Sequence, residues 1–257
     1  MFAQLENKTV CITGASSGIG EATAWLFAEC KARLILLARR EDKLAALAEK
    51  IREAHKVEIY IATLDVRKQE QVQAVFTELP LEWQGIDILV NNAGLAAGKD
   101  SFQSALLTDY EQMIDTNIKG LIYVTRAALP CMLKCQAGHI INIGSLAGRE
   151  NYPGGSVYSA TKHAVRSLSA SLKMDLLGTN IRVSSVDPGL VETEFSVVRF
   201  KGDKESAAKV YQGMKPLTAT DIAEIIVFTA SRPEHVNISE VLVMPTAQAS
   251  SLLVARE

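Results

Sequence analysis

The chain has 257 residues, of which 48% are hydrophobic and 7 are proline, so it can bury a large core within one α/β domain. Its 27 Lys and Arg residues nearly balance 29 Asp and Glu residues, and the net charge of -2 excludes a general field for gathering nucleic acid or an anionic membrane. No apolar stretch approaches the ~20 residues of a membrane span, and the first residues lack an export signal, so we expect a soluble, cytoplasmic protein.

Short apolar runs rich in β-branched residues alternate with longer helical patterns along the whole chain. This alternation predicts a doubly wound Rossmann fold, in which seven parallel strands carry helices on both faces and residues 1–257 form a single domain. The predicted strands are residues 9–13, 34–38, 58–64, 86–91, 139–143, 182–186 and 240–244. The predicted helices are residues 20–30, 42–55, 68–79, 109–134, 157–177 and 220–230.

Three glycines and two serines follow the first predicted strand, in the sequence TGASSGIG. Glycines let the backbone approach a pyrophosphate closely, and the next helix offers unpaired N–H groups at its N-terminus. The spacing differs from the general G-x-G-x-x-G fingerprint, and such turns also serve structural ends, so their position in the first βα turn is what favours dinucleotide binding. The predicted cofactor contacts here are Gly14, Ser16, Ser17, Gly18, Ile19 and Gly20.

The second predicted strand ends at Ala38, where a dinucleotide's adenosine ribose is expected. An acidic residue there would favour NAD, but this chain has Arg39 and Arg40. Two guanidinium groups can pair with a 2′-phosphate, so the sequence predicts NADP. The alternative is a solvated start to the next helix, which is weakened because cations are unfavourable at a helix N-terminus.

Two further strand ends reach the same crevice. Asp65 and Val66 follow the third strand, where a carboxylate can accept a hydrogen bond from the adenine amino group. Asn91, Ala93 and Gly94 follow the fourth strand. Each group alone is an ordinary turn. Because parallel strands end at one edge of the sheet, we expect these residues to contact the cofactor.

Cys131, Cys135 and His139 raise the question of a metal site, because a spacing of four can place ligands along one helix face. We favour ordinary thiols, since Gly138 should end the helix before His139 and no fourth ligand lies nearby. The 4 cysteines also make no disulfide framework in a chain of this length without an export signal. We expect reduced thiols and no metal.

Tyr158 and Lys162 stand four residues apart in SVYSATKHAV, so they share one face of the predicted helix 157–177. Ser145 ends the strand segment HIINIGS and can meet Tyr158 across the crevice. A phenol with an unperturbed pKa near ~10 is a poor base at neutral pH, but a nearby ammonium favours the phenolate. These residues predict proton exchange between Tyr158 and a substrate oxygen.

Residues 190–218 form the longest segment without a predicted strand, and they directly follow a strand end. Ligands of open α/β sheets bind at the carboxyl ends of strands. We therefore expect this segment to form a mobile substrate lid.

With these residues placed, the whole chain resembles the short-chain dehydrogenase/reductase family. Each motif alone has an ordinary structural explanation, but together they follow the family's order. The motifs are TGASSGIG, NNAG at 91–94, Asn117 in DTNIKG, Ser145, Tyr158 with Lys162, and DPGLVET at 187–193. The resemblance implies an oxidoreductase that uses NADP.

The resemblance also implies a role for each matching residue. Tyr158 would be the general acid and base, and Ser145 would hydrogen-bond the substrate oxygen. Lys162 would lower the pKa of Tyr158 and hold the nicotinamide ribose, while Asn117 would anchor a water that continues the proton path. The carboxamide end of the cofactor would be held by Pro188, Gly189, Val191 and Thr193.

Within the family, the stretches LDVR at 64–67, PGLVETEFSVVRFKGD at 188–203 and HVNISEVLVMP at 235–245 resemble a subgroup of NADP-dependent 3-hydroxy acid dehydrogenases. This implies hydride transfer between the nicotinamide and C3 of a small 3-hydroxy acid (serine, allo-threonine or a 3-hydroxypropionate-like acid) or its 3-oxo counterpart. A broad-specificity NADPH carbonyl reductase stays open, and it would be favoured only if the inner face of the lid is apolar. A catalytically silent NADPH-binding regulator is the third alternative, disfavoured by the intact catalytic set.

A substrate carboxylate left unpaired near the nicotinamide would be costly, so it needs a cationic partner. The candidates are Arg149, Arg199 and Lys201. Arg199 is favoured because a guanidinium can hold a carboxylate bidentately, although a solvated loop is the alternative. The family resemblance also implies a homotetramer that pairs helices 109–134 and 157–177, whose apolar residues exceed what one core face requires.

Overall fold

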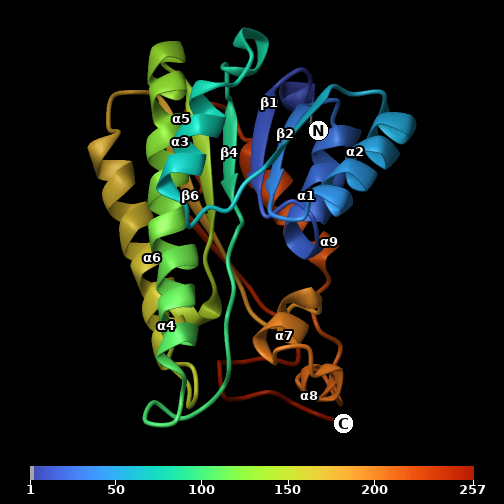
Figure 1. Ribbon diagram of the computed structural model, residues 1–257, viewed down its shortest axis with the longest axis vertical. Helices are drawn as coiled ribbons and strands as arrows, with labels where there is room; N and C mark the ends of the chain where they lie inside the picture. The colour runs from blue at the N-terminus through green and yellow to red at the C-terminus, as the bar shows by residue number, and fades with distance from the viewer. Residues whose placement is uncertain (1–2) are drawn as a thin grey trace.

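The computed structural model describes residues 3–257, which form one seven-stranded parallel sheet with helices on both faces (Figure 1). The strand order β3-β2-β1-β4-β5-β6-β7 is doubly wound, which confirms the predicted fold class. The strands are β1 (Thr9–Thr13), β2 (Arg33–Ala38), β3 (Ile59–Thr63), β4 (Ile88–Asn91), β5 (Gly138–Ile143), β6 (Ile181–Pro188) and β7 (Glu240–Val243). The helices are α1 (Gly18–Glu29), α2 (Glu41–His55), α3 (Gln69–Thr77), α4 (Leu107–Ile114), α5 (Leu121–Cys135), α6 (Ser156–Asp175), α7 (Glu194–Arg199), α8 (Lys204–Lys209) and α9 (Ala219–Ala230).

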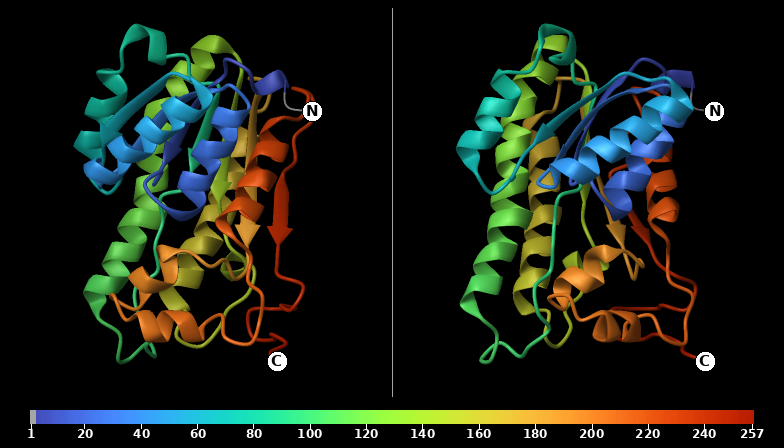
Figure 2. Two further views of the ribbon diagram at one scale, coloured as in Figure 1. Left: turned by 90° about the vertical axis from the view of Figure 1, so that its right-hand side faces the viewer. Right: turned by 45° about the vertical axis from the view of Figure 1, so that its right-hand side comes forward.

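The helices form two layers around the sheet (Figures 1 and 2). Helices α1, α2 and α9 cover one face, with α1 packed against both α2 and α9. On the other face α3 packs against α5, and α4 packs against α6. Each predicted strand matches the structure to within two residues at either end.

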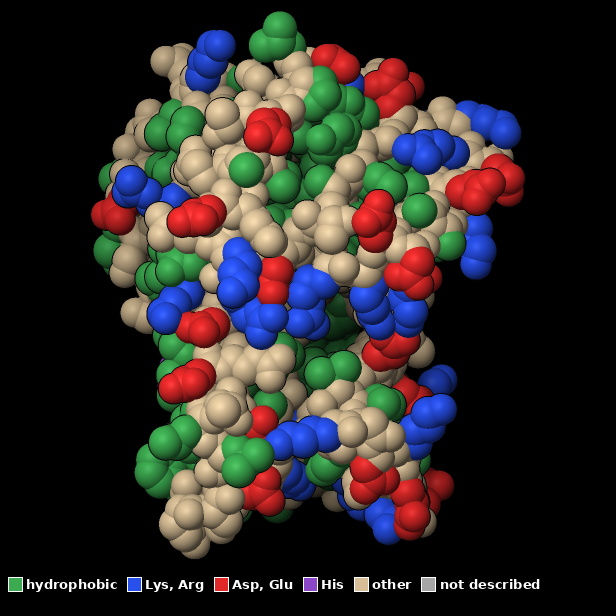
Figure 3. All heavy atoms as spheres, in the orientation of Figure 1, with side chains coloured by type: hydrophobic (Ala, Val, Ile, Leu, Met, Phe, Trp, Pro, Cys, Tyr) green, Lys and Arg blue, Asp and Glu red, His purple; other side chains and the backbone are tan. Residues whose placement is uncertain are grey.

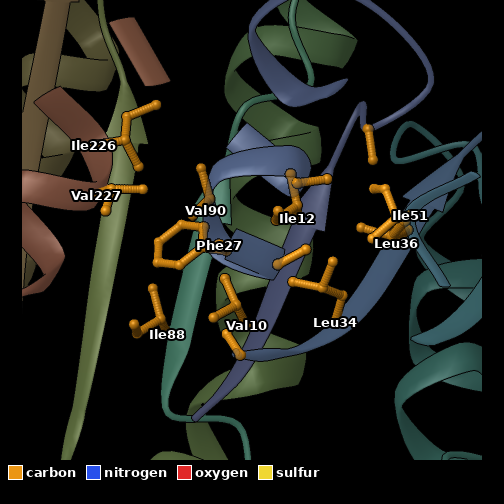
Figure 4. Close-up of a cluster of buried hydrophobic side chains, with 14 of the residues drawn as sticks. Val10, Ile12, Phe27, Leu34, Leu36, Ile51, Ile88, Val90, Ile226 and Val227 are labelled. Atoms are coloured by element: carbon orange, nitrogen blue, oxygen red, sulfur yellow. The ribbon is translucent and has the colours of Figure 1, made fainter. Parts of the chain in front are cut away.

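Alternate residues of each strand enter two separate cores. Val10 and Ile12 of β1 join the cluster beneath α1 and α9, while Cys11 between them joins the cluster on the opposite face. Successive strand side chains point to opposite faces, so a strand that is apolar along its whole length must be covered on both sides. Figure 4 shows Phe27 of α1 in the first cluster, with Ile226 of α9 completing it.

The predicted helix 109–134 is interrupted in the structure. Helix α4 ends at Ile114, a π-helical turn spans Asp115–Gly120, and α5 continues from Leu121. The expectation that Gly138 ends this helix is wrong, because Gln136 already takes the left-handed conformation (φ 51°) and Gly138 belongs to β5. Within residues 3–257, no helix is both long and apolar enough to cross a membrane.

The segment 190–218 lies beyond the carboxyl ends of the strands and contains the short helices α7 and α8 (Figure 2). Thr193 caps α7 by accepting a hydrogen bond from the N–H of Phe195, and Asp203 caps α8 in the same way through Glu205 and Ser206. The pattern alone did not predict these helices, because six residues are too few to show a helical period.

Candidate active site

A cavity of about 360 Å³ opens at the carboxyl ends of the strands, between the sheet and residues 190–218. Figure 3 shows Lys and Arg side chains bordering a hollow at this level of the molecule. The predicted site residues that line the cavity are Gly14, Ser16, Ser17, Gly18, Ile19, Arg39, Arg40, Asp65, Val66, Ala93, Gly94, Ser145, Tyr158, Lys162, Pro188, Gly189, Val191, Thr193 and Arg199. The predicted site residues that do not line it are Gly20, Asn91 and Asn117.

The glycine-rich turn is packed so closely that side chains do not fit. A Cβ added to Gly20 would lie 2.4 Å from the carbonyl oxygen of Gly14, and one added to Gly18 (φ +57°) would lie 3.3 Å from the Cβ of Thr193. Ser17 precedes α1 without a side-chain capping bond, so this cap leaves the first N–H groups of the 12-residue helix without a side-chain acceptor, and Ser17, Gly18 and Ile19 line the cavity. The arrangement fits a pyrophosphate.

The two arginines after β2 have different surroundings. Arg40 donates to the hydroxyl of Ser17 through Nη2 (2.6 Å) and to that of Ser16 through Nε (3.2 Å). Its Nη1 pairs with Oε2 of Glu194 at 2.9 Å. Arg39 is exposed at the rim and forms no hydrogen bond or ion pair within residues 3–257. Of the two guanidinium groups, that of Arg39 is therefore the one without a protein partner among residues 3–257.

Glu194 connects the first turn of α7 to the segment after β2. Lys43 Nζ lies 2.9 Å from its Oε1, opposite the contact with Arg40. Hydrogen bonds from Lys43 and Arg40 lower the pKa of Glu194 to about 2. These side chains are 40–48% exposed, so both ion pairs of Glu194 lie at the surface. Sequence reasoning missed Glu194, because it lies far along the chain from Arg40 and carries no motif.

Asp65 is bound by a neighbour that the sequence analysis did not assign to the site. Arg67 donates from Nε and Nη2 to both carboxylate oxygens of Asp65, at 2.5–3.0 Å. These hydrogen bonds lower the pKa of Asp65. Asp65 is therefore ionised, and both its carboxylate oxygens already accept hydrogen bonds from Arg67, which also lines the cavity.

The side chains of Asn91 and Asn117 build the wall behind the cavity. Asn91 Nδ2 donates to Thr125 Oγ1 and to Asn142 Oδ1, each at 2.9 Å. Asn117 accepts from the N–H of Leu95 (2.9 Å) and donates to the Leu95 carbonyl (2.8 Å), which clamps the segment after β4. Asn117 lies in the π-helical turn, a type of distortion often found at functional sites.

Tyr158 and Lys162 lie one turn apart on α6, as expected. Desolvation raises the pKa of the Tyr158 phenol above its ordinary value, while a hydrogen-bonding contribution from Ser145 and the charge of Arg199 act to lower it. Lys162 Nζ lies 6.0 Å from the Tyr158 ring centroid and donates to the carbonyl of Ile143 at 2.8 Å. Burial lowers the pKa of Lys162 to about 8.

Ser145 begins the turn that follows β5. Its Oγ accepts from the N–H of Ala147 at 3.1 Å and lies 3.5 Å from the carbonyl oxygen of Pro188. Both contacts hold the hydroxyl at the cavity wall near Tyr158. Ser145 is thus oriented by the backbone on either side of the crevice.

The three cations considered for a substrate carboxylate differ in their partners. Arg149 Nη2 pairs with Asp187 Oδ2 (2.7 Å) and Glu240 Oε2 (2.6 Å), and Lys201 Nζ pairs with Asp109 Oδ2 (2.7 Å). In the described chain, Arg199 has no carboxylate partner.

Arg199 instead lies between backbone carbonyls and aromatic rings. Its Nε donates to Gly98 O (3.1 Å), and its Nη2 reaches Gly154 O (3.5 Å). The guanidinium carbon lies 5.3 Å from the Tyr152 ring centroid and 5.9 Å from that of Tyr158. Arg199 is therefore held beside Tyr158, and among the described residues no carboxylate compensates its charge.

The residues considered for a metal lie apart from this cavity. Cys131 is half-buried and Cys135 exposed on α5, whereas His139 is buried in β5 with its Nε2 2.7 Å from Ser184 Oγ. Burial lowers the pKa of His139 to about 3. His139 therefore packs as a neutral core side chain.

Comparison with known proteins adds the following findings. A family model for short chain dehydrogenases matches residues 8–204. The NADP-dependent 3-hydroxy acid dehydrogenase of Schizosaccharomyces pombe is 45% identical over 257 residues, covering 100% of this chain and 99% of that protein. Sulfoacetaldehyde reductase 2 of Chromohalobacter salexigens is 47% identical over 243 residues, covering 94% and 96% respectively.

A solved structure of a serine dehydrogenase, in a closed form complexed with NADP+, superposes with a TM-score of 0.92 at 45% identity. The match covers 97% of this chain and 99% of that one.

Proposed function

The chain belongs to the short-chain dehydrogenase family, and from that premise we propose that it is an NADP-dependent oxidoreductase of small 3-hydroxy acids or their 3-oxo counterparts. The observation that carries the substrate class is Arg199, a cation without a carboxylate partner in the described chain, 5.9 Å from the Tyr158 ring. The serine dehydrogenase and 3-hydroxy acid dehydrogenase relatives support it.

The residues of the cavity divide the chemistry between them. When NADP is bound, it supplies the acceptor or donor of hydride. In oxidation, Tyr158 Oη takes the proton of the substrate hydroxyl while Ser145 Oγ hydrogen-bonds the same oxygen. Burial lowers the pKa of Lys162 to about 8, so Lys162 is still charged at neutral pH. In this proposal its charge favours the phenolate, and its ammonium would hold the nicotinamide ribose. In reduction the proton moves from Tyr158 to the carbonyl oxygen, a direction that abundant NADPH favours.

The cofactor contacts follow from the turn geometry. Gly14, Gly18 and Gly20 leave room at the start of α1, where the pyrophosphate would bind, and Arg39 would meet the 2′-phosphate. Thr193 and its neighbours Pro188, Gly189 and Val191 also line the cavity and would hold the carboxamide end. Asn117 clamps the segment after β4, and in this proposal it also anchors the water that continues the proton path.

Arg199 binds the substrate anion in this proposal. A 3-hydroxy acid places its carboxylate two bonds from the reacting carbon, and sulfoacetaldehyde places its sulfonate at the same distance. One guanidinium beside Tyr158 therefore suits both relatives' substrates, since it pairs with either anion in charge-assisted hydrogen bonds. The inner face of the lid is mixed, with apolar Phe195 and Val198 beside Arg199.

The test compares Arg199→Met with the unaltered enzyme on three substrates: 3-hydroxypropionate, the sulfonate analogue, and an uncharged alcohol of similar size. We expect kcat/KM to fall about 10- to 100-fold for the anions alone, the effect of losing a hydrogen bond to a charged group. Loss on all three would indicate a lid defect, and no loss would exclude Arg199. If the unaltered enzyme prefers the uncharged alcohol, the result would support a broad carbonyl reductase. If the unaltered protein turns over none of the three substrates, the result would support a catalytically silent regulator.

We also infer a cytoplasmic homotetramer that pairs α4 and α5 with α6. Large apolar side chains are exposed on these helices, among them Ile122 (36%), Leu133 (41%) and Met174 (75%). Such surface is more than a monomer needs to expose. Sedimentation at micromolar concentration tests this, and a stable monomer would refute it.

A further inference from the structure

A buried carboxylate at the end of β6 takes no part in the chemistry proposed above. Asp187 is 1% exposed, and both its oxygens are bound. Its Oδ1 accepts the hydroxyl of Ser185, and its Oδ2 accepts from Nε (3.1 Å) and Nη2 (2.7 Å) of Arg149. A charge is costly to bury, so a paired carboxylate in this position calls for a reason other than stability.

The Asp187 carboxylate touches the turn that carries Ser145 from one side. A Cβ added to Gly144 would lie 1.9 Å from Asp187 Oδ1, so only glycine fits directly before Ser145. The N–H of Gly144 also donates to the carbonyl of Val186 at 2.8 Å. The backbone entering Ser145 is therefore pressed against the end of β6.

The same carboxylate holds the turn from the other side. Ser145 caps the short 3-10 turn Leu146–Gly148, and Arg149 follows that turn directly. Because Arg149 binds Asp187 through two nitrogens, the chain before and after the turn is tied to one side chain. Two nitrogens that share one acceptor oxygen restrict the orientation of the guanidinium more than a single hydrogen bond does.

Further ion pairs lead from this contact to the surface. Arg149 also pairs with Glu240 of β7, which in turn pairs with Arg166 of α6. Side-chain exposure rises outward, from 2% at Asp187 through 24% at Arg149 and 31% at Glu240 to 45% at Arg166. The inner pair, unlike the outer ones, is shielded from solvent and salt.

We propose that Asp187 and Arg149 are positioning residues that hold the Ser145 hydroxyl at the substrate oxygen. The pair touches the turn on both sides of Ser145, and neither residue lines the cavity. The charge of Asp187 also acts to raise the pKa of Lys162, so the variants that keep Asp187 ionised carry the test. The inference rests on the proposed role of Ser145 in binding the substrate oxygen. Arg149 is thereby removed from the candidates for the substrate anion, because it pairs with Asp187 and Glu240 and does not line the cavity.

The test is a double-mutant cycle. Arg149→Gln and Ser145→Ala are made singly and together, and kcat/KM is measured with 3-hydroxypropionate and NADP. We expect Arg149→Gln to lower kcat/KM about tenfold in the unaltered background but less than twofold when Ser145 is already Ala, since a displaced turn matters only through the hydroxyl. Affinity for NADPH, measured by its fluorescence, should stay within twofold.

Three further variants separate positioning from folding. Arg166→Gln, which leaves the inner pair intact, should change neither kcat/KM nor the melting temperature appreciably, and Arg149→Lys should restore part of the activity. Arg149→Gln leaves Asp187 with one partner fewer, so the neutral pair Asp187→Asn with Arg149→Gln is tested as well. It should melt closer to the unaltered enzyme yet keep the loss of kcat/KM.

The outcomes distinguish this inference from the proposed function. If Ser145→Ala alone leaves kcat/KM unchanged, the role of Ser145 is wrong and the positioning role falls with it. If Ser145→Ala is impaired but Arg149→Gln costs the same in both backgrounds, the proposed function stands and the positioning role is overturned. An equal loss of NADPH affinity in Arg149→Gln would also overturn it.

Discussion

The floor of the cavity and the segment 190–218 above it, which we propose as a lid, are held in place by different kinds of contact. The floor consists of strand ends and the glycine turn, where backbone approaches backbone and side chains such as Asn117 and Lys162 are buried. The segment 190–218 is attached by an exposed ion pair of Glu194 with Arg40 and by Lys201 with the buried carboxylate of Asp109. Close backbone packing tolerates almost no change, whereas exposed ion pairs are each worth roughly 0–1 kcal/mol.

The difference teaches where precision is needed. Hydride and proton transfer depend on sub-ångström placement, so the reacting groups lie on the rigid floor. A lid must open and close for substrates to exchange, which weak contacts allow. The residue that breaks this division is Arg199, a lid residue placed beside the floor's Tyr158.

The largest effect should come from the floor. Tyr158→Phe removes only a hydroxyl, so turnover should fall about 10²- to 10⁴-fold, the usual contribution of a general acid or base. Because the phenolate forms as the pH rises, oxidation by the unaltered enzyme should speed up toward alkaline pH, and that rise should vanish in the variant. The measurements are kcat against pH and NADPH titration by fluorescence, in which affinity should not change. Normal turnover would remove Tyr158 from the mechanism.

A second change tests the packing of the floor. Gly20→Ala places a methyl group 2.4 Å from a backbone oxygen that cannot move aside, so the turn must shift. We expect the free energy of unfolding to fall by about 1–3 kcal/mol and NADPH binding to weaken at least tenfold. Gly85→Ala is the matched control, since nothing lies within 4 Å of its added Cβ. Equal melting temperatures for the two variants would contradict this account of the turn.

Cofactor choice lies at the rim between floor and lid. Arg39→Ala should raise the apparent KM for NADP by about 10- to 100-fold, the loss of one bond to a charged group, and leave that for NAD little changed. Arg40→Ala should affect both cofactors alike, because Arg40 holds Ser16, Ser17 and Glu194 together. The measurement is steady-state kinetics with each cofactor. If Arg39→Ala raises the KM for NADP and the KM for NAD equally, Arg39 does not bind the 2′-phosphate.

The smallest effect should come from the lid. Glu194→Gln breaks two exposed ion pairs, so the KM for NADP should change no more than about threefold, while proteases should cut residues 190–218 faster. The depressed pKa of Glu194 means that these ion pairs are fully present above its ordinary value of 4.5 and are lost as the pH falls through about 2. Glu205→Gln, whose ion pair stays within α8, is the control. If proteolysis of Glu194→Gln is unchanged, the ion pairs of Glu194 do not restrain residues 190–218.

The fold was predictable because each strand is a short apolar run bounded by turn residues, so neither its position nor its parallel pairing needed tertiary information. The π-helical turn around Asn117 was not predictable. The sequence of α4, the π-helical turn and α5 looks like that of one uninterrupted helix. The turn is recognised only in the structure, where Asn117 hydrogen-bonds the backbone of Leu95.

The site was predictable where a motif lies within a few residues, as with Tyr158 and Lys162. It was not predictable where partners meet from distant parts of the chain. The sequence placed Arg39 and Arg40 together on the 2′-phosphate, but it could not show that Glu194 would reach Arg40. Capping signals at Thr193 and Asp203 could have revealed α7 and α8.

The packing of α9 on α1 has a consequence for how the protein is made. During synthesis β1, β2 and α1 leave the ribosome long before α9, so Phe27 and its neighbours wait without the side chains that cover them, Ile226 among them (Figure 4). Long-range parallel pairing folds slowly, and uncovered apolar surface aggregates. A nascent chain that stalls before residue 219 would therefore be a client for chaperones and not a small cofactor-binding protein in its own right.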